Sequence, residues 1–82
     1  MMNPGRKASN RGTPQMITEI GIAAGDIWHY LDQRGNATLD QLVKGIGRPR
    51  ELLLMSLGWL GREGHVTLGG PESGYLTSLA SR

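Results

Sequence analysis

Apolar residues between positions 16 and 34 recur at helical spacing and predict a first helix. They follow one another at intervals of three, four, three, one and three residues: Ile17, Ile20, Ala24, Ile27, Trp28 and Leu31. Such intervals place side chains on one helical face, so all six, Trp28 included, are expected in the core. Thr18 is the predicted N-cap, and Gly35-Asn36 supplies the stop. The opposite face, with Asp26 and His29, is expected to be solvated.

Two further helices are predicted downstream, and their ends are marked by capping and stop residues. Thr38, with Gln41 three positions later, has the spacing of a capping box, and Gly47 ends the short helix that follows. Pro49 suits the first position of a third helix, which continues to about Glu63. The predicted buried side chains are aliphatic residues at helical spacing: Leu39, Leu42, Val43 and Ile46 in the second helix, and Leu53, Leu57 and Leu60 in the third.

After Gly64 the apolar period falls from 3.6 to 2, which predicts a β-hairpin. Residues 65–68 and 75–79 are the two expected strands, and residues 69–74 are the six-residue tip. Ala37 allows one short strand before the second helix. Three helices followed by a two-stranded hairpin is the order of a winged helix-turn-helix domain, in the mainly α (α+β) class.

Two stretches of the chain also resemble a known family. They are Ile20-Gly21-x-x-Ala24-Gly25-x-Ile27-Trp28-x-x-Leu31 and Leu57-Gly58-Trp59-Leu60-x-Arg62-Glu63-Gly64-x-Val66. In these motifs the chain resembles the small bacterial winged helix-turn-helix proteins that are catalogued as a domain of unknown function. The likeness covers roughly residues 16 to 68. It implies a winged-helix fold and no established biochemistry.

Charge and polarity divide the chain into an arm and a domain. The 82 residues include nine basic and seven acidic side chains, and three of the basic ones lie at 1–15, where no acid occurs. We therefore expect a flexible basic arm at 1–15, a folded domain at 16–79 and a disordered end at 80–82. No apolar run reaches the roughly 20 residues that span a bilayer, so we expect a cytoplasmic protein without a membrane partner.

Catalysis has little support in the sequence. The chain has no cysteine, which excludes thiolate chemistry and cysteine zinc sites. His29 has Asp26 three residues before it and Asp32 three after it, but a further strong ligand is missing. We predict that the chain is not an enzyme, has no catalytic or metal site, and uses no cofactor or small-molecule substrate.

Double-stranded DNA is the partner that the fold class favours, because such domains place their third helix in the major groove. Three basic residues cluster at the turn before that helix: Lys44, Arg48 and Arg50. We expect them to contact phosphates or, alternatively, to be solvated and offset by Glu51. The outward face of the helix has no Asn or Gln to read adenine. The predicted function is a DNA-binding protein and transcription regulator, with these candidate contacts: Arg6, Lys7, Arg11, Lys44, Arg48, Arg50 and Arg62.

Protein association is the alternative function. Gly21, Gly25, Gly58 and Gly61 lie inside predicted helices, where each costs on the order of 1 kcal/mol relative to alanine. Without a Cβ atom, each lets another backbone approach closely, either within this domain or across a dimer seam. The third helix also carries more large apolar side chains than a three-helix core can bury. This predicts an interface for a homodimer or another protein through Leu54, Met55, Gly58 and Trp59.

Overall fold

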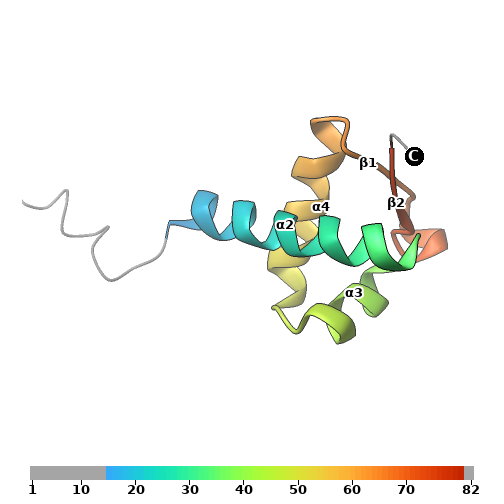
Figure 1. The fold of residues 1–82 in the computed structure, drawn as a ribbon, viewed down its shortest axis with the longest axis horizontal. Coiled ribbons are helices and arrows are strands. Elements are labelled where there is room, and N and C mark those ends of the chain that lie inside the picture. The colour runs from blue at the N-terminus through green and yellow to red at the C-terminus, as the bar shows by residue number, and fades with distance from the viewer. Residues whose placement is uncertain (1–14, 81–82) are drawn as a thin grey trace, which may run out of the picture.

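The computed structural model describes residues 15–80, in which three helices are followed by a two-stranded antiparallel sheet. The elements are α2 (Met16–Arg34), α3 (Leu39–Ile46), α4 (Arg50–Arg62), β1 (Val66–Leu68), the short 3-10 helix η1 (Pro71–Ser73) and β2 (Thr77–Leu79). Figure 1 shows α2 crossing α4, with α3 on one side of α2 and the sheet beside its C-terminal end. The predicted winged helix-turn-helix architecture is confirmed. The arm cations Arg6, Lys7 and Arg11 lie outside the described residues.

α2 begins one turn earlier than its predicted cap. Gln15 occupies the N-cap position with no capping hydrogen bond from its side chain, and its carbonyl accepts from the Glu19 amide at 3.0 Å. Thr18 therefore lies inside the helix, and its prediction as N-cap is wrong. The end is as predicted, because the Gly35 amide donates to the Leu31 carbonyl at 2.8 Å.

The apolar residues of α2 divide between the core and the surface. Ala23, Ala24, Ile27 and Leu31 are buried, whereas Trp28 is 40% exposed. The prediction that Trp28 belongs to the core is wrong, and Ile17, at 79% exposed, also lies outside it. The reason is geometric: each residue advances about 100° around the helix, so Trp28 points well away from the direction of Ile27.

α3 and α4 follow the predicted capping closely. Thr38 and Gln41 form the reciprocal capping box, and Gly47 ends α3 in the left-handed conformation with φ 81°. Pro49 is the N-cap residue of α4, one position before the site expected for it, because its ψ of 141° keeps it outside the helix. The core of α4 includes the predicted leucines together with two further residues: Leu52, Leu53, Ser56, Leu57 and Leu60.

A buried serine of α4, Ser56, lies where α2 and α4 cross. Ser56 is fully buried, and its hydroxyl donates to the Leu52 carbonyl at 2.8 Å. The same oxygen lies 3.3 Å from the Ile20 carbonyl of α2. The serine thus satisfies its own buried hydroxyl within α4 and brings the two helices close together.

The wing is held against the helices by backbone hydrogen bonds. Val66 pairs with Leu79 in the antiparallel sheet, and Ala37 forms the predicted short bridge, here to Thr77. β2 starts two residues later than expected, because Gly74 and Tyr75 adopt positive φ values of 68° and 57° and remain in the loop. The hairpin is confirmed with a longer tip than predicted.

Candidate functional site

Arg48 and Arg50, two of the predicted phosphate contacts, each form an ion pair with an acidic residue of the domain. Arg48, in the turn between α3 and α4, donates from Nε to Asp26 Oδ2 of α2. Arg50, the first residue of α4, donates from Nη1 to Asp40 Oδ1 of α3. Asp26 was expected to face solvent, and Glu51 was the expected counter-charge. The Arg48–Asp26 pair was not predicted, because its partners are 22 residues apart and meet only through the packing of α2.

Asp40 joins two of the candidate cations. Hydrogen bonding and charge attraction from Arg50, together with a smaller attraction from Lys44, lower the pKa of the Asp40 carboxyl. The side chains of Arg50 and Asp40 are 55% and 75% exposed, and such solvent-exposed ion pairs contribute little to stability. The arginine can therefore exchange its partner for another anion at little cost.

Charge on the described residues does not favour a polyanion as a whole. Residues 15–80 contain five basic and seven acidic side chains, a net charge of −2 with neutral histidines. Within this part of the chain, Lys44 and Arg62 are the cations for which no ion pair or ring contact is found. Any attraction for phosphate from these residues is consequently local, at the α3–α4 turn.

Arg62 and the wing tip stand apart from that turn. Arg62 ends α4, so it lies about 18 Å along the helix axis from Arg50. In the tip, the amides of Gly69 and Gly74 donate to the carbonyls of Leu76 and Pro71. Because these two amides already donate within the hairpin, they are not available to phosphate oxygens.

A groove of about 270 Å³ opens between α2, α4 and the start of the wing. Trp28 and Trp59, 40% and 46% exposed, belong to its lining. The Trp59 ring also lies 6.1 Å from the ring of His65, centre to centre. The groove is lined by Gly21, Ala24, Gly25, Trp28, Trp59, Leu60 and His65.

The groove agrees only in part with the predicted interface. Leu54, Met55 and Trp59 are exposed as expected, and a Cβ at Gly58 would meet no atom within 4 Å. Trp28 was not among the predicted interface residues. Gly61 does not line the groove, because a Cβ there would contact Leu68 of the wing at 3.9 Å.

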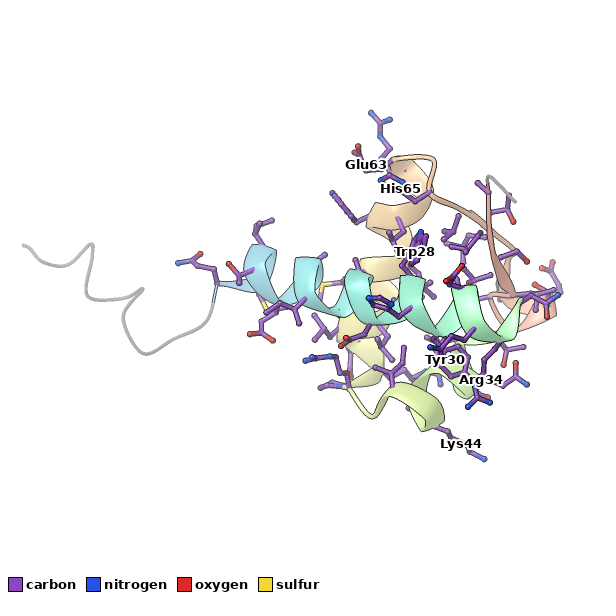
Figure 2. All side chains as sticks on the ribbon, in the orientation of Figure 1. Trp28, Tyr30, Arg34, Lys44, Glu63 and His65 are labelled. Atoms are coloured by element: carbon purple, nitrogen blue, oxygen red, sulfur yellow. The ribbon has the colours of Figure 1, made fainter. Side chains whose placement is uncertain are left out.

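The opposite side of α2 is polar. Figure 2 shows Tyr30 and Arg34 on the side of α2 that faces α3 and Lys44, whereas Trp28 lies toward His65. The Arg34 guanidinium carbon lies 5.1 Å from the centre of the Tyr30 ring. These two residues, with Gln33, Asn36 and Gln41, line a hollow of about 530 Å³.

The described residues contain neither a cluster of metal ligands nor a helix that could span a membrane. Residues 15–80 contain no group of three or more metal-ligating side chains close enough to hold an ion. None of the helices in that part of the chain is both long and apolar enough to cross a membrane.

Comparison with known proteins identifies one family. The family model described as a winged helix-turn-helix domain (DUF2582) matches residues 15–76, most of the chain. No curated protein and no solved structure matches significantly. The matched region includes the α3–α4 turn, the groove and most of the wing.

Proposed function

We propose that the chain, which belongs to the winged helix-turn-helix family DUF2582, binds double-stranded DNA through the turn between α3 and α4. The observation that carries the proposal is that Arg48 and Arg50 lie at the start of α4, the helix that such domains insert into the major groove, with Lys44 in the last turn of α3. A guanidinium has five N–H donors, and each arginine uses one for its carboxylate. The remaining donors are available to phosphate oxygens.

The binding is expected to depend on the DNA backbone more than on its sequence. The outward face of α4 presents Glu51, Leu54, Met55, Gly58 and Arg62, and only Arg62 has the donors that read a guanine edge. Backbone contacts fix position without selecting bases. We therefore propose a DNA-binding protein of low sequence preference, and a role in transcription regulation would rest on a separate source of specificity.

Asp40→Asn is the most informative variant for this proposal. It removes the carboxylate that pairs with Arg50 and attracts Lys44, so two cations become available and affinity for random-sequence duplex should rise at least threefold. Glu63→Gln is the matched control, because it removes one negative charge at the far end of α4 (Figure 2). Fluorescence anisotropy with the full chain, at several salt concentrations, measures both.

The salt dependence gives a second criterion. Six phosphate contacts, from Arg6, Lys7, Arg11 and the three cations of the turn, would give a slope of log K against log salt of roughly −5. A slope shallower than about −2, or equal effects of Asp40→Asn and Glu63→Gln, would contradict the proposal.

A second candidate function is protein association. The observation that favours it is the groove with two exposed tryptophans, because buried tryptophans dominate the energetics of many protein interfaces. Such a surface does not require the chain to bind DNA.

A further inference from the structure

We infer that the groove face of α2 and α4 is a homodimer interface, in which α2 packs antiparallel against α2 of a second copy. The groove is unfilled in the single chain, and its exposed tryptophans face solvent. The inference goes beyond DNA binding and does not depend on it. The evidence for a second copy as the occupant comes from the residue pattern, the area and the charge of this face.

Residues 15–80 leave the groove uncovered. Within residues 15–80, Trp28 and Trp59 remain 40% and 46% exposed after every described contact is made. The residues outside that range are mostly polar or basic, and Met1, Met2 and Ala8 are their only apolar side chains apart from prolines. A polar and basic segment does not match an apolar groove, so we assign the cover to another molecule.

The face of α2 reads the same in both directions. Ile17, Gly21, Gly25 and Trp28 follow at intervals of four, four and three residues, which places them along one side of the helix. The order is large, small, small, large. An antiparallel second copy therefore brings each Ile17 opposite the partner helix's Trp28, with small residues in the middle where the two backbones approach closely.

The geometry of a two-fold axis fits this pattern. With the axis beside the middle of α2, near residues 22 and 23, Ile17 lies about 8 Å before it and Trp28 about 8 Å after it. A two-fold interface needs projecting and receding parts on the same patch. Here the projecting parts are the two indoles, and the receding part is the glycine-lined groove, where a Cβ at Gly21 or Gly25 would meet nothing within 4 Å.

The exposed apolar area is large enough for the core of a small dimer interface. The indoles leave 40% and 46% of their surface in water, and together with Ile17 they present roughly 400 Å². This is about half of the ~800 Å² that a standard interface takes from each partner, and interface cores are mostly apolar. The side of α2 from Ile17 through Gly21 and Gly25 to Trp28 carries no charge, so two copies meet without like-charge repulsion.

The exposed first turn of α2 also favours packing against a second copy. Figure 1 shows the N-terminal turns of α2 extending past α4, away from the remaining elements. This end carries Ile17 at 79% and Met16 at 49% exposure. In the antiparallel pair these apolar side chains pack on the second copy, which removes them from water.

Matched glycine substitutions test the interface. Gly21→Gln adds a large polar side chain to the centre of the proposed interface. Gly58→Gln adds the same side chain to the outward face of α4, because Gly58, although expected at an interface from the sequence, does not line the groove. Both sites are helical and open, so both variants should fold and gain helix propensity, raising the Tm of the dilute protein by a few degrees. Circular dichroism on dilute samples checks this.

Sedimentation equilibrium of the full chain, without DNA, from about 5 to 500 µM measures the association. We expect a monomer–dimer equilibrium whose dissociation constant rises at least tenfold in Gly21→Gln and changes less than twofold in Gly58→Gln. Tryptophan emission should shift to the blue as the dimer forms. A wild-type chain that stays monomeric at 500 µM, or equal effects of the two variants, would overturn the inference. Because DNA is absent, either result leaves the DNA proposal to its own test.

Discussion

The side of α2 that faces α3 is paired and packed, whereas its other side lines an open groove. Toward α3 the helix presents Asp26 and Tyr30, which are engaged by Arg48 and by Arg34, and the Tyr30 ring fills the space beside Gly45. Its other side presents Gly21, Gly25 and Trp28, which line an open groove, and Trp28 lies toward His65 (Figure 2). Among residues 15–80, the first side is covered by packed and paired side chains and the second side is left open.

This difference indicates two kinds of interaction. The ion pairs at the α3–α4 turn are largely exposed and cheap to exchange, which suits salt-dependent contacts with phosphate. The apolar groove gains free energy only when water is removed from it, which suits association with another protein surface. The proposals for DNA and for a dimer thus use separate surfaces, one at the α3–α4 turn and the other along the groove side of α2.

The largest expected effect separates the core of α2 from its groove side. Ile27→Ala should destabilise the domain by about 2–5 kcal/mol, because Ile27 is fully buried. Trp28→Ala should cost less, about 2 kcal/mol, although more atoms are removed, because 40% of the residue is already exposed. Urea denaturation of dilute protein measures both, and a larger loss for Trp28→Ala would show that the tryptophan belongs to the core.

Replacing Gly45 of α3 and Gly25 of α2 by alanine should change the free energy of unfolding in opposite directions. Gly45→Ala places a methyl group against the Tyr30 ring, and overpacking partly offset by helix propensity should destabilise the domain by about 1 kcal/mol. Gly25→Ala meets open space and should stabilise the monomer by up to about 1 kcal/mol. Thermal denaturation at low concentration compares them, and the same sign in both variants would contradict the described packing.

The cations at the two ends of α4 should contribute unequally to DNA binding. Arg48→Gln removes one phosphate contact at the turn, so the slope of log K against log salt should decrease by about 0.9 and affinity at 0.1 M salt should fall roughly tenfold. Arg62→Gln, at the other end of the helix, should change affinity less than twofold. A greater loss for Arg62→Gln would move the DNA interface away from the turn.

The smallest expected effect concerns the ion pair of Asp40. Arg50 lowers the pKa of this carboxyl, so the contribution of the pair to stability is present above the unfolded-state pKa of about 3.9 and is lost as pH falls through the lower folded-state pKa. In Arg50→Gln the pKa should rise toward its ordinary value. An NMR titration of the carboxyl carbon measures the change, and an unchanged midpoint would show that the pair does not form in solution.

The fold could be predicted from the sequence because its boundaries depend on local signals. The capping box at Thr38 and Gln41 and the left-handed glycines at 47 and 64 act within a few residues. Trp28 was misassigned because the apolar positions of α2 form two adjacent stripes, a core and a groove side. A single helical period does not separate them.

The candidate site could be predicted only in part. The cations around the turn follow from their positions in the sequence, but their partners, Asp26 and Asp40, depend on how α2 and α3 pack against α4. The groove likewise combines residues of α2, α4 and the wing. The spacing of Ile17, Gly21, Gly25 and Trp28 was a local signal for it.

Amide chemical shifts during titration of the full chain with a short random-sequence duplex test the proposed DNA interface most directly. We expect amide shifts at Lys44, Arg48, Arg50 and the first turn of α4. The amides of the groove residues Gly21, Gly25 and Trp28 should not change at constant protein concentration. Shifts confined to the groove, or none at the turn at low salt, would contradict it.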